Sequence, residues 1–455
     1  MKKILFPMLA FCAASLWAAP FKDGDRVVFL GDSITHHGKY MEQIALYYAT
    51  RFPEADIWFS GSGESGGSAS GAMRRLDMDV VAKKPTVVTV MFGMNDINRG
   101  AWPRTGETEA NRKNQQNAIA GFKANTKKLV AAIREKAGNP EIVYLTPSPY
   151  DQSCLIDGKP ADIICNNGLA LIGAWTAEQA KLEGVTCVDL QTFLRTLNER
   201  EQAKNPQWSF MRLGTGSFDR VHPRAFGHQF FAYTFLKAQG VPADVSRIVI
   251  DAARGAATDL FNAEVKDLVA TRTSVSFTAL EKALPYPFDD ERRKACDYAP
   301  IVEDLNRETF RVAGLDAGTY ALTIDGKEVG TWSAQDLAAG VNLAMNEKTP
   351  QNAQAQTVWK AMVEQWRNQT IIRDVHMWRL WQKGKLPLDD MNAYRDWFAK
   401  KYPQGAKDFF GYMAKQYLDN WERRDAVEKT VDAGRAEVKA RAKCVPHVWK
   451  LVRVE

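Results

Sequence analysis

Short apolar runs alternate with longer amphipathic stretches through the first half of the chain. The apolar runs are rich in β-branched residues and predict five buried strands, at residues 27–30, 57–59, 87–92, 142–145 and 185–190. The stretches between and after them have apolar residues at helical spacing and predict helices near residues 40–52, 71–84, 110–137, 167–183 and 223–239. Strands that are apolar on both faces must be covered by helices on both sides. The pattern therefore predicts an α/β fold with a mostly parallel, five-stranded sheet.

The pattern changes after about residue 250. Residues 271–341 alternate apolar and polar positions, and Asp325-Gly326 lies between two alternating runs as a two-residue hairpin turn. Thr349-Pro350 then begins a helical, tryptophan-rich stretch, whose tryptophans at helical spacing favour core packing over a sugar-stacking surface. These are Trp359, Trp366, Trp378, Trp381 and Trp397. We therefore divide the chain into residues 20–250 (α/β domain), 251–345 (β-rich accessory region) and 346–455 (helical C-terminal region).

Residues 1–19 have the layout of a secretory signal peptide. Lys2 and Lys3 precede an apolar stretch at residues 4–17, and Ala18-Ala19 provide a small-residue exit. The apolar stretch is shorter than the roughly 20 residues that a membrane-spanning helix needs. The alternative interpretation is an N-terminal anchor that is not cleaved. We therefore expect an exported protein, periplasmic or extracellular, with no stable membrane insertion after the signal peptide is cleaved.

Composition and charge narrow the class of protein. The chain is 45% hydrophobic and 25% charged, which is typical of a soluble globular protein. The formal net charge of +6 is spread without a basic run, so the sequence indicates no nucleic-acid partner. Among the cysteines that would remain after cleavage, Cys154 and Cys165 bracket a polar loop and are the first candidates for a disulfide. No C-x-x-C spacing indicates a zinc or redox site.

A serine follows the first predicted strand, in Gly31-Asp32-Ser33, where the carboxyl edge of a parallel sheet would expose it. A serine needs a base within hydrogen-bond reach to become a nucleophile. His36 and His37 lie too near Ser33 in sequence for an easy fit, and His376 and His447 lie in the C-terminal region. The remaining histidines are His228 and His222, and Asp219, three residues before His222, could orient the imidazole of His222.

Two further loops follow predicted strands. In Gly93-Met94-Asn95-Asp96, the Asn95 amide can donate to the oxyanion that forms when a serine attacks a carbonyl. The glycine-rich stretch at residues 61–71 leaves backbone N–H groups free to approach a ligand. A phosphate-binding loop is the rival interpretation of this stretch, but the G-x-x-x-x-G-K-[ST] pattern is absent.

These four blocks, taken in order, resemble the GDSL/SGNH hydrolase family over roughly residues 25–240. The resemblance implies a flavodoxin-like, three-layer domain that needs neither metal nor cofactor. It also implies Ser33 as nucleophile, His222 as base and Asp219 as its orienting partner. The oxyanion hole would comprise the N–H groups of Ser33 and Gly66 and the Asn95 side chain. The family commonly has an asparagine where this chain has Gly61, so Gly63 and Gly67 stay open as alternatives to Gly66.

The resemblance also suggests a substrate class. Exported members with an added β-rich part are often similar to glycan deacetylases, so we expect hydrolysis of short acyl esters, above all of O-acetyl groups on a carbohydrate. Arg99 and Trp102, just past Asn95, could form one wall of the pocket, although surface exposure or packing explains them equally. The alternatives are a lipase or thioesterase for longer acyl chains, and a glycan-binding protein on a hydrolase frame that no longer turns over.

Overall fold

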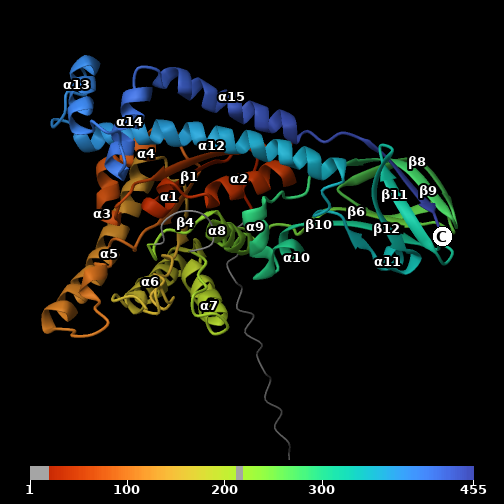
Figure 1. Cartoon of the computed structure of the whole chain (residues 1–455), viewed down its shortest axis with the longest axis horizontal. Helices are drawn as coiled ribbons and strands as arrows, with labels where there is room; N and C mark the ends of the chain where they lie inside the picture. Colours follow the sequence, from red (N-terminus) through yellow and green to blue (C-terminus); the bar gives the residue numbers. More distant parts are fainter. Residues whose placement is uncertain (1–19, 212–218) are drawn as a thin grey trace, which may run out of the picture.

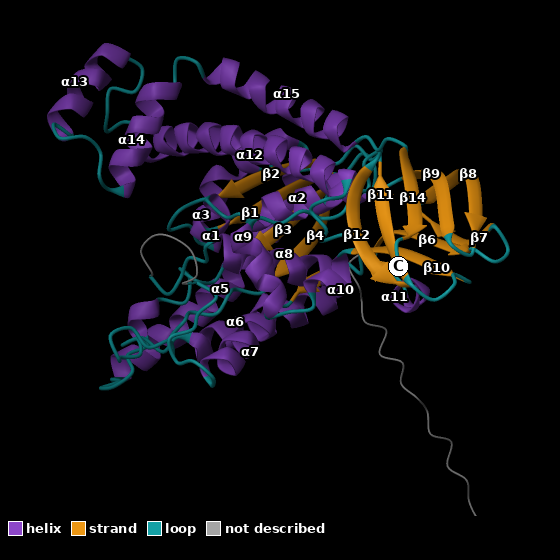
Figure 2. Cartoon of the chain, turned by 45° about the vertical axis from the view of Figure 1, so that its right-hand side comes forward, coloured by secondary structure: helices purple, strands orange, loops and turns teal. Residues whose placement is uncertain are grey.

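The computed structural model describes residues 20–211 and 219–455 in three parts (Figure 1). An α/β domain comes first, a β-sandwich follows, and a set of long helices lies across the α/β domain (Figure 2). The predicted signal peptide lies outside the described residues. Within the described residues, no helix combines the length and the apolarity needed to cross a membrane.

The α/β domain is built on one parallel sheet in the order β2-β1-β3-β4-β5. The strands are β1 (Arg26–Gly31), β2 (Trp58–Gly63), β3 (Val87–Met91), β4 (Glu141–Leu145) and β5 (Thr186–Val188). The central strand β3 is buried along its whole length, as its run of apolar and β-branched residues requires. This order is the flavodoxin-like one, so the predicted fold class and its five strands are confirmed.

Two layers of helices enclose the sheet. α2 packs against α8, and α5 packs against α6. The long helices of this domain are α2 (Tyr40–Arg51), α5 (Glu109–Lys136), α6 (Asn166–Glu183), α7 (Leu190–Gln202) and α8 (Ala225–Ala238). Short helices lie near the carboxyl edge of the sheet: α1 (Ser33–His36), α3 (Ala69–Ala72) and α4 (Leu76–Asp79). The loops that follow the strands therefore meet at this edge, where open α/β sheets bind their ligands.

The β-sandwich consists of a four-stranded sheet, β13-β10-β6-β7, and a five-stranded sheet, β12-β11-β14-β9-β8. Its strands are β6 (Asp244–Asp251), β7 (Ala256–Phe261), β8 (Ala263–Thr271), β9 (Ser274–Glu281), β10 (Arg307–Ala313), β11 (Thr319–Ile324), β12 (Lys327–Ser333), β13 (Val341–Asn342) and β14 (His447–Arg453). Its short helix is α11 (Ala334–Ala339), whereas α9 (Asp290–Arg293) and α10 (Ile301–Leu305) lie between β9 and β10 in sequence and pack against α8 of the α/β domain. The predicted turn joins β11 to β12, and both Asp325 and Gly326 have positive φ, as a primed hairpin turn requires.

Two predicted boundaries are wrong. β6 begins at Asp244, inside the range assigned to the α/β domain, and β14 lies inside the range assigned to helices. β14 pairs with β9 and β11, strands that lie more than a hundred residues earlier in the chain. Its ladder is therefore entirely long-range, and seven residues at the end of a helical stretch carry no local signal strong enough to reveal it.

Four helices, which we call the helical arm, form the last part. They are α12 (Pro350–Gln382), α13 (Met391–Lys401), α14 (Phe409–Asn420) and α15 (Arg424–Ala442). α12 begins as predicted, with the Thr349 side chain accepting from the Asn352 N–H and Pro350 in the first turn. At about 1.5 Å per residue it extends for about 50 Å, from the sandwich across α2 (Figure 1). The five tryptophans predicted to pack in the core, and Trp421 with them, lie in or against hydrophobic clusters, and Trp366 and Trp378 are buried.

The predicted disulfide between Cys154 and Cys165 does not form. Cys165 is a free thiol packed in the core of the α/β domain, where burial raises its pKa to about 12. Cys154 is also buried, and its thiol donates to the carbonyl of Gln207. Both sulfurs are therefore part of the interior, and the polar loop between the two cysteines gives no information about this packing.

Candidate active site

Ser33 lies where β1 ends and α1 begins. Asp32 caps this helix, and its Oδ1 accepts from the Ile34 N–H at 2.9 Å. Burial raises the pKa of Asp32 to about 7. A Cβ on Gly31 would lie 2.2 Å from Oγ1 of Thr35, so only glycine allows the chain to turn this sharply. The turn leaves Ser33 partly exposed at the carboxyl edge of the sheet.

Asp219 and His222 occupy one loop before α8. Oδ1 of Asp219 accepts from the backbone N–H groups of Val221 and His222, at 3.0 and 2.9 Å. Arg220, between them, has a φ of 64°, and its buried guanidinium donates to the carbonyls of Asp151 and Cys154. A left-handed arginine is uncommon, and here the buried hydrogen bonds fix the conformation.

Ser33, His222 and Asp219 form one hydrogen-bonded line. The Nε2 of His222 lies 2.8 Å from the Ser33 Oγ, and its Nδ1 lies 2.5 Å from Oδ2 of Asp219. Partial burial alone would raise the pKa of Asp219, but the hydrogen bonds from His222 outweigh it and hold that pKa well below its usual range. An ionised Asp219 accepts from Nδ1–H, which leaves the Nε2 lone pair facing the serine hydroxyl. This is the geometry that a serine nucleophile and its base need.

His228, the other candidate base near this loop, does not take part. It is buried, its ring stacks on Tyr40, and burial lowers its pKa to about 3. It is therefore a neutral side chain of the core.

The loop after β3 places Asn95 beside the glycine-rich loop. Its Nδ2 donates to the carbonyl of Gly67 at 2.8 Å, and its Oδ1 accepts from Arg99 at 3.2 Å. Asp96 braces the same loops, because its carboxylate accepts from the N–H groups of Ala69 and Gly93. Burial raises the pKa of Asp96 to about 6 despite these bonds. The amide of Asn95 is thus held at both ends, with one N–H left over.

The glycine-rich loop contains a tight turn over residues 64–67. Its closing hydrogen bond runs from the Gly67 N–H to the Glu64 carbonyl at 2.9 Å, and Gly66 has a φ of 74°. Within residues 20–211 and 219–455, the N–H groups of Ser33 and Gly66 have no acceptor. The Gly67 N–H is occupied in the turn, and Gly63 lies in β2 opposite Gly31. Among the three glycines left open by the sequence, the geometry therefore favours Gly66 as the oxyanion donor.

Gly63 has a structural role that can be tested. A Cβ at this position would lie 2.1 Å from the backbone nitrogen of His36 and 2.5 Å from its Cα, so β2 or α1 would have to move. We expect Gly63→Ala to lower the free energy of unfolding by about 1–3 kcal/mol. Gly121→Ala in α5, where a Cβ meets no atom within 4 Å, is the matched control and should be neutral or slightly stabilising. Urea unfolding measures both, and an unchanged midpoint for Gly63→Ala would contradict the close approach.

Arg99 and Trp102, predicted as a pocket wall, both make contacts within the protein. Arg99 donates to the Met94 carbonyl as well as to Asn95. The Trp102 indole N–H donates to the Ile97 carbonyl, and its ring lies against α6, where a Cβ on Gly168 would meet it at 2.4 Å. These contacts hold the loop that carries Asn95, and a role of either residue in substrate binding stays a prediction.

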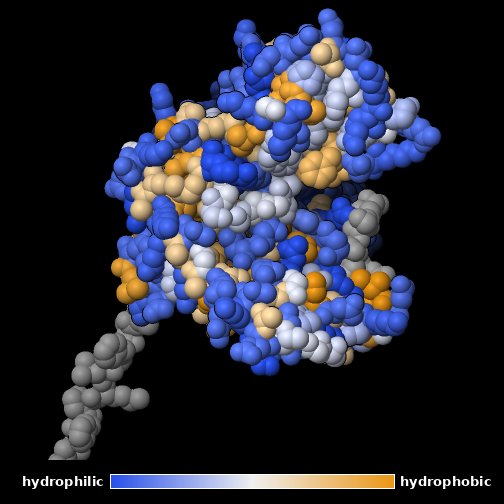
Figure 3. Space-filling view, turned by 90° about the vertical axis from the view of Figure 1, so that its left-hand side faces the viewer, coloured by the Kyte–Doolittle hydropathy of each residue, from blue (hydrophilic) through white to orange (hydrophobic). Residues whose placement is uncertain are grey.

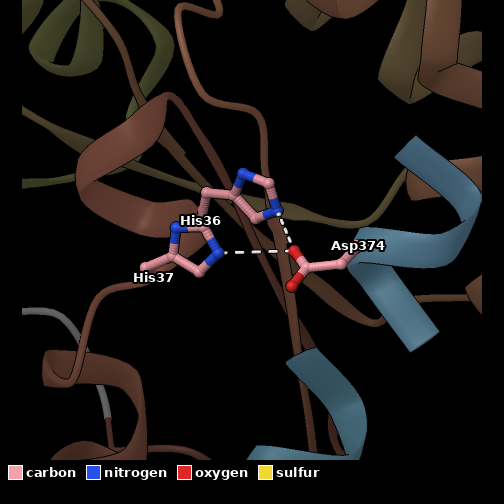
Figure 4. A group of neighbouring side chains, drawn as sticks. All are labelled: His36, His37 and Asp374. Atoms are coloured by element: carbon pink, nitrogen blue, oxygen red, sulfur yellow. Dashed lines mark hydrogen bonds and ion pairs between the residues drawn. The ribbon is translucent and has the colours of Figure 1, made fainter. Parts of the chain in front are cut away.

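Two buried side chains near the site have positions that the sequence did not predict. His36 lies behind the glycine-rich turn, and Asp374 comes from α12 in the helical arm. Together with His37 they form a group, the His-His-Asp cluster, in which one ligand atom from each residue lies within 4.8 Å of the others (Figure 4). These are the described residues that could hold a metal ion. The double histidine was visible in the sequence, but nothing in the sequence indicated its carboxylate partner.

Residues 29–230 match the model of the GDSL-like Lipase/Acylhydrolase family. The solved structure of a gut microbial diltiazem-metabolizing enzyme is similar over 96% of this chain and 99% of that chain, with a TM-score of 0.85 and 30% identity. An acetylxylan esterase from Geobacillus stearothermophilus is 25% identical over 233 residues, which is 48% of this chain and 94% of the relative. A crystal structure of an acetylxylan esterase from the same organism gives a TM-score of 0.37 at 22% identity, over 49% of this chain and 96% of that chain.

The similarity to the diltiazem-metabolizing enzyme extends over all three parts of the chain, whereas the family match covers the α/β domain. The four sequence blocks, the flavodoxin-like sheet, the family match and the similarity to the diltiazem-metabolizing enzyme agree. The chain therefore belongs to the GDSL-like lipase/acylhydrolase family and is an esterase.

Proposed function

We propose that this protein is a serine esterase that removes short acyl groups, above all O-acetyl groups, from a carbohydrate. The observation that carries the proposal is the line from Ser33 through His222 to Asp219, with its 2.8 Å and 2.5 Å hydrogen bonds. A serine aligned in this way is activated by its histidine without any further group.

In the first step, the Ser33 Oγ attacks the ester carbonyl carbon while His222 Nε2 accepts the hydroxyl proton. The carbonyl π electrons move to oxygen, which becomes an oxyanion. When the tetrahedral intermediate collapses, the bond to the alcohol oxygen breaks, and His222 donates its proton to that oxygen. The products are the free alcohol and an acyl group bound to Ser33.

In the second step, water attacks the acyl carbon and gives its proton to His222. Collapse of the second intermediate breaks the bond to the Ser33 Oγ, which takes the proton back. The acid leaves and the enzyme is restored. The pKa of Asp219 is held well below its usual range, so its carboxylate is ionised. This negative charge stabilises the imidazolium of His222 in both steps.

The oxyanion would be bound by the Ser33 and Gly66 N–H groups and by the Asn95 amide. Hydrogen bonds join the loops that carry these donors. The Glu64 N–H donates to the Gly31 carbonyl, and the Asn95 amide donates to the Gly67 carbonyl. Donors fixed before the reaction stabilise developing charge without reorganising during the reaction.

An exposed aromatic surface near the site supports a carbohydrate ester. Phe409, Phe410 and Tyr412 on α14 are 37%, 57% and 41% exposed, and His37 contacts both Phe409 and Tyr412 edge-on. His37 follows α1, four residues after Ser33. Seen from the end of the molecule, the surface is hollowed between the helical arm and the α/β domain (Figure 3). Aromatic side chains beside a polar site are typical of pockets that hold a ring-shaped ligand. The acetylxylan esterase among the relatives agrees with this substrate class.

We also propose that the protein is exported, on the basis of the pattern of residues 1–19 in the sequence. An O-acetylated glycan outside the cell would be a substrate in the same compartment.

The dependence of kcat/KM on the length of the acyl chain tests the substrate class. With p-nitrophenyl esters, which share one leaving group, we expect kcat/KM for acetate to exceed that for octanoate by about 10²-fold or more, because a site shaped for a short acyl group excludes additional methylenes. Acetate release from a panel of acetylated oligosaccharides, with diltiazem as a non-carbohydrate comparison, then identifies the alcohol. A preference for octanoate would favour a lipase or thioesterase. A folded protein that hydrolyses none of these esters would favour a glycan-binding role.

A further inference from the structure

The His-His-Asp cluster joins the helical arm to the loops of the active site. The Nε2 of His36 lies 2.9 Å from Oδ1 of Asp374, and the Nε2 of His37 lies 3.3 Å from the same oxygen (Figure 4). The side chains of His36 and Asp374 are fully buried, whereas that of His37 is 38% exposed. The other oxygen of Asp374 accepts from the Tyr412 hydroxyl at 2.9 Å. A buried carboxylate is therefore surrounded by three donors.

The other side of His36 defines its tautomer. The backbone N–H of Ser65 donates to His36 Nδ1 at 3.1 Å, and the Ser65 Oγ lies 3.0 Å from the same nitrogen. A backbone N–H can only donate, so Nδ1 carries no proton. A neutral imidazole then has its proton on Nε2, the atom that faces Asp374. Burial lowers the pKa of His36 to about 4, which agrees with a neutral ring.

Asp374 is the ionised end of this chain of hydrogen bonds. Burial alone would raise its pKa, but the hydrogen bonds from His36 and His37 outweigh it and lower the pKa to about 2. The chain of contacts therefore runs from the Ser65 N–H to His36 Nδ1, and from Nε2 of the same ring to Oδ1 of the carboxylate, 2.9 Å away. The carboxylate also accepts from His37 and from the Tyr412 hydroxyl, so the buried charge is satisfied.

A metal ion is the rival explanation of the cluster. A histidine that binds a metal through one nitrogen normally donates the N–H of its other nitrogen to a nearby acceptor. In His36 the other nitrogen accepts from a backbone N–H, so a metal at Nε2 would leave the Ser65 N–H facing another N–H or a ring without any proton. The arrangement therefore favours a hydrogen-bond chain.

Ser65 is the residue that the chain holds, and it belongs to the turn that carries Gly66. α12 supports this turn at two further points. The Arg373 guanidinium donates to the Gly63 carbonyl at 2.9 Å, and the Trp381 indole N–H donates to the Glu64 carboxylate at 2.8 Å. Trp381 lies seven residues after Asp374 and eight after Arg373, which is two turns farther along the same side of the helix. One face of α12 thus contacts three consecutive residues of the loop, directly or through His36.

We propose that Asp374 is a positioning residue for ester hydrolysis. Through His36 it fixes the Ser65 backbone, and with it the turn whose Gly66 N–H binds the oxyanion. The inference rests on the proposed function and adds a role for the helical arm, which becomes part of the catalytic machinery. Oxyanion donors must be held to within a fraction of an ångström, so loosening the turn should slow the chemical step while leaving substrate binding intact.

Variants on both sides of the imidazole test this role. Asp374→Ala removes the acceptor, and His36→Phe keeps a ring but accepts nothing from Ser65. We expect each to lower kcat for p-nitrophenyl acetate by about 10- to 100-fold, with KM changed by less than about threefold. The double variant should be no slower than the worse single one, because both break one chain. Asp374→Asn, whose Oδ1 can still accept from Nε2–H, should recover most of the lost rate.

Gln369→Ala is the matched control. Gln369 also joins α12 to the α/β domain, by donating to the Phe59 carbonyl, but it does not touch the turn. Its kcat should stay within about twofold of wild type. Active-site concentration is measured from the p-nitrophenol burst and folding from thermal unfolding, so that kcat refers to folded enzyme. If Asp374→Ala does not fold, the kcat values of Asp374→Asn and His36→Phe are compared with that of wild type instead.

Three results would overturn the inference. The first is a full kcat per active site in Asp374→Ala and His36→Phe despite a lower unfolding temperature, which would make the cluster purely structural. The second is an additive loss of rate in the double variant. The third is one equivalent of zinc bound by the wild type and lost in Asp374→Ala, measured by titration calorimetry with ZnCl₂. Failure of the proposed function gives a different pattern, because the wild type would be inactive or Ser33→Ala would stay active.

Discussion

Ser33→Ala is expected to abolish ester hydrolysis, lowering kcat for p-nitrophenyl acetate by about 10⁴- to 10⁶-fold. The alanine removes the only atom that can attack the carbonyl in the line with His222, whose Nε2 lies 2.8 Å from the Ser33 Oγ. Any rate that remains comes from the oxyanion donors and from binding, because these can still assist the attack of water. Stopped assays with wild-type protein as reference measure the loss, and circular dichroism with thermal unfolding shows whether the fold is retained.

Ser70→Ala provides the matched serine variant. Ser70 lies in the same glycine-rich region, but it is exposed, and among the described residues its hydroxyl has a hydrogen bond to the Ser68 hydroxyl alone. Its activity should equal that of wild type. A second check uses an irreversible phosphonate ester, which should label wild type and Ser70→Ala but not Ser33→Ala. Turnover that persists in folded Ser33→Ala, with labelling at another residue, would assign the nucleophile elsewhere.

The sequence predicted the parts of the fold that depend on local pattern. The strands of the central sheet are buried on both faces, so their composition alone reveals them, and the succession of strand and helix units predicts that the sheet is parallel. The Asp325-Gly326 turn was equally local, because both residues need positive φ. β14 was not predictable in this way, since its position depends on β9 and β11, which come much earlier in the chain. The thiols of Cys154 and Cys165 were misjudged for a related reason, because burial depends on packing that loop composition does not report.

At the site, too, the features that depend on local sequence could be predicted and those that depend on long-range packing could not. Ser33, Asn95 and His222 could be predicted because each lies in a loop that follows a strand or precedes a helix, where the topology brings loops together. Asp374 could not be predicted from the sequence, because it is 337 residues from His37 and lies in a helix whose pattern indicates only packing. His36 was set aside as a base on grounds of sequence distance. The structure agrees that it does not face Ser33, but shows that its ring supports the turn behind the site. A positioning residue such as Asp374, which acts through His36, belongs to no sequence motif that would reveal it.

Asn95→Ala is expected to lower kcat by about 10²- to 10³-fold, which corresponds to the roughly 3 kcal/mol that one oxyanion donor supplies. KM should change little, because the full negative charge on oxygen exists only in the transition state and the intermediate. Asn95 also donates to the Gly67 carbonyl, so the alanine variant removes one anchor of the turn as well as a donor. A single substitution therefore cannot separate the two roles.

Asn95→Asp is the companion of the alanine variant and likewise removes both roles of the amide N–H groups. Aspartate keeps the size of the side chain and an oxygen that can accept from Arg99, as Oδ1 of Asn95 does at 3.2 Å. It removes both N–H donors and places a negative charge beside the developing oxyanion, so kcat should fall at least as far as in the alanine variant. Arg99→Met tests the opposite case, because it leaves the amide and removes only the group that orients it, and kcat should fall by less than about tenfold. If Asn95→Asp and Asn95→Ala instead raise KM and leave kcat unchanged, Asn95 binds the ground state, and the N–H groups of Ser33 and Gly66 alone must stabilise the oxyanion.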